Sequence, residues 1–353
     1  MHQRTSDLRI LASNPLVAPA VLEKELPLDD AGAEHIARSR REIGAVFSGA
    51  DDRLVTIVGP CSIHDPAATL EYARLLRGAA ERHAADLLVV MRVYFEKPRT
   101  VVGWKGLIND PDLDGTFAIN RGLNLARRLM REIAALGLPV GTEFLDTTLG
   151  QYYADLVSWG AIGARTVESQ VHRELASGLS MPVGFKNRTD GDVQVAIDAI
   201  RTARHPHWFP SLTPEGTPAI LGTSGNDQTH IVLRGGARGP NFSPKHIAAV
   251  AALLRKNSLS PHVMVDCSHA NSGKDPERQP AVAAELAAQI AQGHRTVAGV
   301  MLESNLIGGS QNYLDRPLIY GQSITDGCLA WEKTLPVLAQ LADAVRKRRG
   351  ARV

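Results

Sequence analysis

Eight short apolar runs, separated by helical patterns, are the feature that most restricts how this chain can fold. The runs that predict strands are 54–58, 87–93, 138–143, 160–165, 182–186, 230–234, 262–266 and 297–302. The patterns that predict helices lie at 67–85, 122–136, 151–158, 193–203, 244–256 and 279–292. Strands that alternate with helices over about 250 residues are typical of a (β/α)8 barrel, the TIM barrel of the α/β class. A doubly wound sheet should carry a glycine-rich phosphate loop after its first strand, and neither GxGxxG nor GxxxxGK[ST] occurs.

Two segments lie outside this alternation. Residues 1–32 contain apolar side chains and prolines that prevent a long helix, so we expect an arm, followed by a helix over 31–47. We therefore expect two parts: an N-terminal arm and helix (1–50) for subunit contacts and regulation, and a catalytic barrel (51–353). The proline-rich stretch 205–222 predicts an inserted β-hairpin before the sixth strand, and loops of this kind on a barrel tend to be functional.

The composition is that of a soluble globular protein, with 44% hydrophobic and 22% charged residues. A net charge of +2 without an internal basic block gives no indication of a nucleic-acid partner. Three cysteines are too few for a disulfide framework, and the sequence has neither an apolar signal segment nor a run of about 18 apolar residues. We therefore expect a cytoplasmic protein that binds neither nucleic acid nor membrane.

Each predicted strand ends on, or just before, a reactive side chain. These side chains are Cys61, Arg92, Glu143, Arg165, Lys186, Arg234, Asp266 with nearby His269, and Glu303. A lone thiol after a strand could simply fill space in the core, and a lone cation could cap a loop. Ordinary solvated surface residues would not explain a reactive side chain at the end of all eight strands. Charged residues are rarely buried unless they are paired. Barrel enzymes carry their chemistry at the carboxyl ends of the strands, so these residues predict one site.

The candidate residues form two chemical sets. The first is a group of six cations: Arg92, Lys97, Arg99, Arg165, Lys186 and Arg234. Arginine forks match phosphate and carboxylate oxygens, so this set predicts two phosphorylated substrates, or one phosphate and one carboxylate. The second set consists of Cys61, His269, Glu303 and Asp326. Its sulfur, nitrogen and oxygen donors predict a divalent transition metal, which would be catalytic if one coordination position stays open for substrate.

Long motifs within these regions carry a family resemblance. They are GPCSIHD at 59–65, MRVYFEKPRT at 91–100, GWKGLINDP at 103–111, GARTVESQ at 163–170, PVGFKN at 182–187, LRGG at 233–236, VDCSH at 265–269 and YGQSITD at 320–326. Over roughly residues 5–345, the chain resembles class I 3-deoxy-D-arabino-heptulosonate 7-phosphate (DAHP) synthase. It is most similar to the subclass that aromatic amino acids regulate.

The resemblance implies that phosphoenolpyruvate condenses with erythrose 4-phosphate and water to give DAHP and phosphate, the first step of the shikimate pathway to chorismate. It implies one divalent metal per subunit, Mn²⁺ in the first place and Fe²⁺, Co²⁺ or Zn²⁺ otherwise, held by Cys61, His269, Glu303 and Asp326. Phosphoenolpyruvate would be bound by Arg92, Glu143, Ala164, Arg165, Lys186 and Arg234. Erythrose 4-phosphate would be bound by Lys97, Pro98, Arg99 and Thr100. The catalytic residues would be Lys97, Cys61 and His269, with Lys97 as the hypothetical proton donor to the aldehyde oxygen.

The resemblance also implies feedback inhibition by an aromatic amino acid. The positions that match the family's effector pocket are Phe144, Gln151, Leu175, Leu179, Ser180, Phe209, Ser211 and Leu221. Serine at 211 occurs in relatives that respond to phenylalanine or tryptophan, and phenylalanine is the effector we favour. The arm of a neighbouring subunit would close over the pocket, which implies a homodimer or homotetramer.

Two other functions compete with this one. The first is the related synthase that joins phosphoenolpyruvate to arabinose 5-phosphate, 3-deoxy-manno-octulosonate 8-phosphate synthase, but KPRT at 97–100 favours the four-carbon sugar phosphate. The second is a non-catalytic aromatic amino-acid sensor, which should have lost a metal ligand or an anion-binding cation, and none is missing. The chain departs from the family at Arg188, where glycine is usual; this arginine either adds a cation to the site or is solvated.

Overall fold

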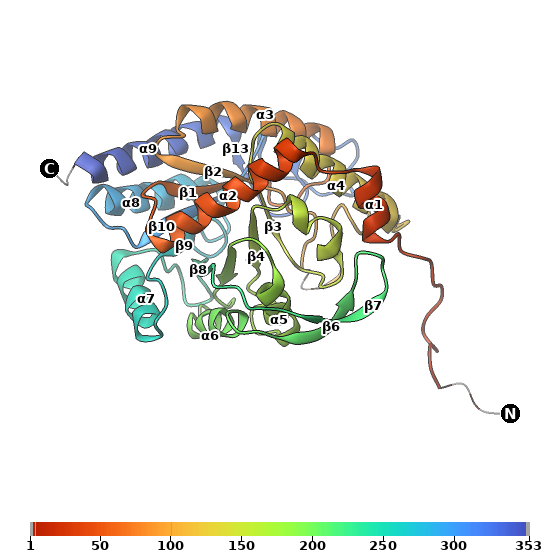
Figure 1. Cartoon of the computed structure of the whole chain (residues 1–353). Coiled ribbons are helices and arrows are strands. Elements are labelled where there is room, and N and C mark those ends of the chain that lie inside the picture. Colours follow the sequence, from red (N-terminus) through yellow and green to blue (C-terminus); the bar gives the residue numbers. More distant parts are fainter. Residues whose placement is uncertain (1–2, 4, 100, 351–353) are drawn as a thin grey trace.

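Eight parallel strands close into a barrel in the computed structural model, which describes residues 3, 5–99 and 101–350 (Figure 1). The strands are β1 (Leu54–Gly59), β2 (Leu87–Arg92), β3 (Val140–Glu143), β4 (Trp159–Ile162), β5 (Val183–Lys186), β8 (Thr229–Leu233), β9 (Val263–Asp266) and β10 (Val297–Asn305). Neighbours pair in that order, and β1 also pairs with β10, with Val55 opposite Gly299 and Gly59 opposite Glu303. The predicted (β/α)8 barrel is confirmed, and every predicted strand occurs.

Helices connect the strands around the outside of the barrel. They are α3 (Pro66–Arg82), α4 (Ile119–Ala135), α5 (Gln170–Gly178), α6 (Gln194–Ala203), α7 (Pro244–Lys256), α8 (Gln279–Ala291) and α9 (Trp331–Gly350). The sequence supplies caps for several of them: Asp65 accepts from the amides of Ala67 and Ala68 at α3, and Ser243 caps α7. The helices α5 and α9 were not predicted. In α5 only Ala176 and Ser177 are buried, so this helix lacks a clear apolar stripe.

The helix predicted over 151–158 is wrong. That segment forms two 3₁₀ turns, η1 (Leu149–Tyr152) and η2 (Ala154–Leu156). The carbonyl groups of this segment accept hydrogen bonds from arginines of other elements. Arg127 Nη1 donates to the carbonyl of Tyr152 at 3.0 Å, and Arg40 Nη2 donates to that of Ala154 at 2.8 Å. Tertiary hydrogen bonds therefore override the local helical pattern.

The predicted hairpin is present directly before the sixth barrel strand. The strands β6 (Trp208–Leu212) and β7 (Pro218–Gly222) pair antiparallel, with Ser211 opposite Ala219. Figure 1 shows this hairpin at the edge of the barrel, beside α5. Three short strands complete the described chain: β11 (Ile307–Ser310), β12 (Gln322–Ser323) and β13 (Leu329–Ala330).

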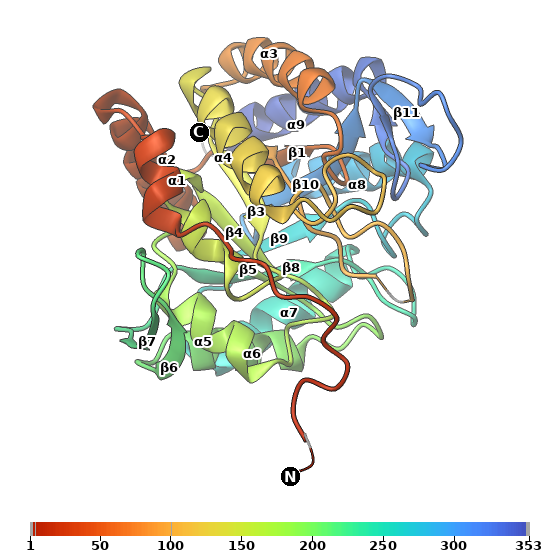
Figure 2. The same ribbon diagram turned by 90° about the vertical axis from the view of Figure 1, so that its right-hand side faces the viewer.

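The N-terminal region closes one end of the barrel. The helix α1 (Pro19–Glu25) leads into α2 (Asp30–Ser48), whose Ile43, Val46 and Phe47 join the apolar cluster inside the barrel. The Phe47 ring stacks on His230 near the start of β8, with ring centroids 3.5 Å apart, so α2 covers the end where the strands begin. Figure 1 and Figure 2 show the chain before α1 running away from the body, and the side chains of Leu8, Ile10 and Leu11 in this segment are exposed. None of the described helices is long and apolar enough to cross a membrane.

Candidate active site

The carboxyl ends of the barrel strands surround one cavity of about 780 Å³. Its lining includes Arg92, Lys97, Pro98, Arg99, Glu143, Ala164, Arg165, Lys186, Arg234, His269 and Asp326. All of these residues were expected at the site from the sequence. Thr100, which was also expected there, lies outside the described residues. Parallel pairing explains the convergence, because it brings every strand's last residue to the same end of the barrel.

Three of the four expected metal ligands form a compact cluster. One ligand atom each from Cys61, Glu303 and Asp326 lies within 4.8 Å of the others. The β1–β10 register places Glu303 opposite Gly59, two residues before the thiol. The fourth residue, His269, has its Nε2 3.9 Å from Glu303 Oε1, at the edge of the cluster. Sulfur, imidazole and carboxylate donors together fit a divalent transition metal better than magnesium or calcium.

Asp266 was among the predicted strand ends but not among the predicted site residues, and the structure places it at the centre of the site. Its Oδ2 lies 2.8 Å from His269 Nδ1 and 3.0 Å from Lys186 Nζ, and its Oδ1 accepts from Ser268 Oγ at 2.6 Å. Burial alone would raise the pKa of Asp266, but the His269 and Lys186 charges hold it well below its ordinary value. This ionised carboxylate orients the imidazole so that Nε2 faces Glu303.

Arg92 uses much of its hydrogen-bonding capacity within the protein. Arg92 is buried, stacks 3.6 Å above the Tyr94 ring, and donates to Glu303 at 2.9 Å and to the Pro60 carbonyl at 3.0 Å. Arg92 thus lines the cavity and also braces Glu303. Burial alone would raise the pKa of Glu303, but His269, Arg92 and other nearby cations lower it overall.

Lys97 connects the cation set with the metal cluster. Its Nζ lies 3.0 Å from Cys61 Sγ, so an ammonium and a thiol share a hydrogen bond beneath the cavity. Burial and the charge of Glu303 raise the pKa of Cys61, and Lys97 opposes this rise. Burial would lower the pKa of Lys97, but its neighbours Cys61 and Glu303 raise it overall, so the side chain stays protonated.

The loops around the cavity are held in place by close backbone contacts. A Cβ at Gly163 would lie 2.1 Å from Glu143 Oε1, so only glycine leaves room for that buried carboxylate. Asn187 accepts from the amide of Arg234 at 2.8 Å and donates to the Gly235 carbonyl at 2.9 Å, which joins the loops after β5 and β8. These contacts fix the cavity wall before any ligand binds.

Arg188 does not add a cation to this cavity. Its guanidinium pairs with Glu168 at 2.6 Å and with Asp190 at 2.8 Å, and it is not part of the cavity lining. These exposed pairs link the loops after β4 and β5 and contribute little to stability. Of the two interpretations of this departure, the solvated one agrees with the structure.

The expected effector residues are brought together only in part. A cavity of about 320 Å³ between α5 and the β6–β7 hairpin is lined by Leu175, Phe209 and Ser211, with Thr147 and Thr148 beside them. The other five expected residues are absent from its described lining: Phe144, Gln151, Leu179, Ser180 and Leu221. The Phe144 side chain is fully buried and stacks on Tyr153 with ring centroids 5.8 Å apart.

Comparison with known proteins agrees with this site. The profile described as the DAHP synthetase I family matches residues 28–339. The chain is 53% identical over 351 residues to the "Phospho-2-dehydro-3-deoxyheptonate aldolase, Phe-sensitive" of Escherichia coli K12, covering 99% of this chain and 100% of the relative. It is 50% identical over 353 residues to the "tyrosine-inhibited" enzyme of Schizosaccharomyces pombe, covering 99% of this chain and 95% of the relative.

A solved structure gives the same result at the level of the fold. The phospho-2-dehydro-3-deoxyheptonate aldolase of Francisella tularensis superposes with a TM-score of 0.95 at 52% identity, covering 96% of this chain and 99% of that chain. These comparisons confirm the resemblance and the class of enzyme that it implied. The barrel, the strand-end residues and the match of almost the whole chain together establish that this protein belongs to the DAHP synthetase I family.

Proposed function

We propose that this protein condenses phosphoenolpyruvate with erythrose 4-phosphate and water to give DAHP and phosphate. The observation that carries the proposal is that the anion-binding side chains share one cavity with His269 and with Asp326, which belongs to the Cys61–Glu303–Asp326 cluster. Lys97 belongs to both groups, because it lines the cavity and contacts the thiol. A reaction that joins two phosphorylated molecules at a carbonyl carbon needs both anion binding and an electrophilic centre.

The cations position the two substrates. Arg165, Lys186 and Arg234 would bind the phosphate and carboxylate of phosphoenolpyruvate, and Arg99 on the loop after β2 would bind erythrose 4-phosphate. Two such anions repel one another in water, so a cavity with fixed positive charge lowers the free energy of bringing them together. Glu143, which is 8% exposed, would orient the water that adds to phosphoenolpyruvate.

The donors of Cys61, His269, Glu303 and Asp326 fit Mn²⁺, Fe²⁺, Co²⁺ or Zn²⁺. An ion held there would supply Lewis acidity toward the aldehyde oxygen. Asp266 fixes the His269 ring through Nδ1 and leaves Nε2 for the ligand position. The Lys97 ammonium, 3.0 Å from the Cys61 sulfur, would donate a proton to the aldehyde oxygen as the new carbon–carbon bond forms.

We further propose regulation by an aromatic amino acid, with phenylalanine preferred, in the cavity lined by Leu175, Phe209 and Ser211. The exposed apolar arm, with Leu8 66% and Leu11 101% exposed, would cover this cavity on a second copy in a homodimer or homotetramer. Relatives that are 50–53% identical and named for sensitivity to phenylalanine or tyrosine support this proposal.

The test is an assay of phosphoenolpyruvate absorbance after addition of erythrose 4-phosphate and Mn²⁺. We expect turnover that a chelator abolishes, and loss of turnover in Lys97→Met with unchanged metal binding. Lys245→Met, an exposed lysine on α7, is the matched control and should keep full activity. Turnover with arabinose 5-phosphate but not with erythrose 4-phosphate would assign the related synthase instead. If none of the four metals supports turnover, the proposed function is refuted.

A further inference from the structure

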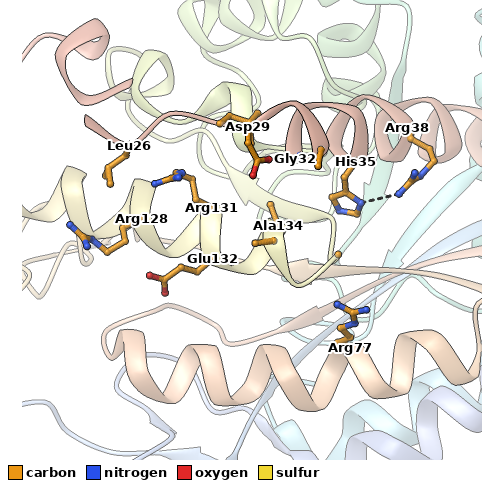
Figure 3. Close-up of a pocket in the computed structure, with 14 residues that line it drawn as sticks. Leu26, Asp29, Gly32, His35, Arg38, Arg77, Arg128, Arg131, Glu132 and Ala134 are labelled. Atoms are coloured by element: carbon orange, nitrogen blue, oxygen red, sulfur yellow. Dashed lines mark hydrogen bonds between the residues drawn. The ribbon is translucent and has the colours of Figure 1, made fainter. Parts of the chain in front are cut away.

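A second cavity, of about 590 Å³, lies at the opposite end of the barrel from the candidate active site. It opens between α2, the end of α4 and Arg77 of α3 (Figure 3). The chain passes from the end of α4 at Ala135 directly to β3, which starts at Val140. The cavity is therefore at the amino ends of the strands. Its volume is within the range of sites that bind small organic molecules.

The cavity combines apolar walls with a cationic rim. Leu26, Leu28 and Ala134 contribute apolar surface from the α1–α2 linker and from α4. The charged side chains at the rim are Arg38, Arg77, Arg128, Arg131, Asp29 and Glu132. Two of the four guanidinium groups pair with carboxylates outside the lining, Arg77 with Glu81 at 2.8 Å and Arg38 with Glu42 at 4.0 Å, so Arg128 and Arg131 are the cations that remain for a ligand. The chemistry is that of a receptor for an anion that also has an apolar body.

The arginines at the rim are incompletely paired. Arg77 is paired with Glu81 at 2.8 Å, whereas Arg128 donates only to the neutral Asn124 Oδ1, at 3.4 Å, within the described part of the chain. The Arg131 side chain is partly buried and has neither a hydrogen bond nor an ion pair with any other residue in the described chain. An unpaired guanidinium next to apolar surface has a more favourable interaction free energy with a bound anion than an exposed guanidinium has.

His35 supplies a further polar group at this cavity, with a poorly satisfied donor. Its Nδ1 lies 3.3 Å from Arg38 Nη2, and because arginine can only donate, Nδ1 accepts and the neutral ring carries its proton on Nε2. This Nε2 is buried and makes no well-aligned hydrogen bond within the described residues, although the Leu138 carbonyl lies beside the ring as a backbone acceptor. Figure 3 shows His35 and Arg38 next to one another on α2, above the helix that carries Ala134. A ligand oxygen aligned with the His35 N–H would give it a better hydrogen bond than the poorly aligned Leu138 carbonyl does.

We propose that this cavity binds a small carboxylic acid with an apolar body. The carboxylate would pair with Arg131, and the apolar body would lie between α2 and α4 against Leu26 and Ala134. Bare phosphate would leave the apolar walls in contact with water, so an amphipathic acid fits better than an inorganic ion. Asp29 does not compete with this anion directly, because it accepts from the Gly32 amide at 2.7 Å as the cap of α2.

The test uses benzoate and inorganic phosphate as probes, in calorimetric titrations of the full chain. Saturating phosphoenolpyruvate is present so that the active-site cations are occupied. We expect saturable benzoate binding that weakens about tenfold or more in Arg131→Gln, as for the loss of a charge-assisted hydrogen bond. Ala135→Phe keeps every charge and fills the cavity from an exposed helix position, so it should abolish binding even if Arg131→Gln folds poorly.

The control is Arg74→Gln, which removes an exposed arginine of α3 that does not line the cavity. Its affinity for benzoate should equal that of the parent protein. The proposal is overturned if benzoate fails to bind, if both cavity variants bind it like the parent, or if phosphate binds as tightly as benzoate. None of these outcomes depends on the condensation reaction, so the proposed function is tested separately.

Discussion

Glu96 offers a direct measurement of how burial controls charge next to the candidate active site. It precedes Lys97, is 4% exposed, and accepts from Tyr153 Oη at 3.2 Å. Burial and then the negative charge of Asp146 raise the pKa of Glu96 from 4.5 to about 8. The folded protein therefore keeps a proton at neutral pH that the unfolded chain has already lost.

The sign and size of the effect on stability follow from this difference. The stabilisation is fully present below pH 4.5, the value of the unfolded chain, and is lost as the pH rises to about 8. Each pH unit in that window costs about 1.4 kcal/mol, so this group should reduce the free energy of unfolding by roughly 3 kcal/mol between about pH 5 and about pH 7.5. Glu96→Gln removes the titration and keeps an oxygen acceptor for Tyr153.

The assay is urea unfolding of the parent and Glu96→Gln at a series of pH values. The variant should be close to the parent in stability near pH 5 and clearly more stable near pH 7.5. Only the parent has the buried Glu96 carboxyl, so only its free energy of unfolding falls for this reason as the pH rises. Glu285→Gln, at an exposed position of α8, is the control and should show no such trend. If the difference between Glu96→Gln and the parent does not change with pH, the reasoning about burial is refuted.

Three further predictions follow from the same kind of contact. Gly163→Ala should lower kcat/KM about a hundredfold with the fold intact, because the added methyl displaces Glu143; circular dichroism and kinetics would check this. Burial lowers the pKa of His230 to about 3, so folded-state stability should fall by about 1.4 kcal/mol per pH unit as the pH drops below about 6.5, and His230→Leu should lose that dependence in urea melts. Arg127→Met should destabilise the protein by about 1–3 kcal/mol in thermal or urea unfolding, because the carbonyls of Leu26 and Tyr152 lose their donor, as does the partly exposed Asp155; an unchanged midpoint would contradict this.

The residues at the strand ends show why much of the site could be predicted. A parallel strand buried on both faces is read from a continuous apolar run, and the residue that follows it must lie at the carboxyl end of the barrel. Cys61, Lys186 and Glu303 were found in this way without any knowledge of their contacts. Asp266 carried the same signal, but only the structure shows that it contacts both His269 and Lys186.

The segment after β3 shows where this reasoning fails. Its sequence pattern predicts a helix over 151–158, yet buried Arg127 and half-buried Arg40 draw its carbonyl groups into other hydrogen bonds. These arginines are 24 or more residues away in the sequence, so no local window contains them. The expected effector residues were separated for a related reason: Leu175, Phe209 and Ser211 share a cavity, whereas Phe144 lies in the core against Tyr153.

The sequence by itself determined the order of strands and helices, the barrel, the inserted hairpin and the identity of the strand-end residues. These properties depend on periodicity and on residue type, which are local and additive along the chain. Only the tertiary structure decided which donors are free, which are paired, and which carboxylates keep a proton. Those properties depend on distance and on desolvation, and both are set by elements that come together only after folding, as α2 and α4 do around the second cavity.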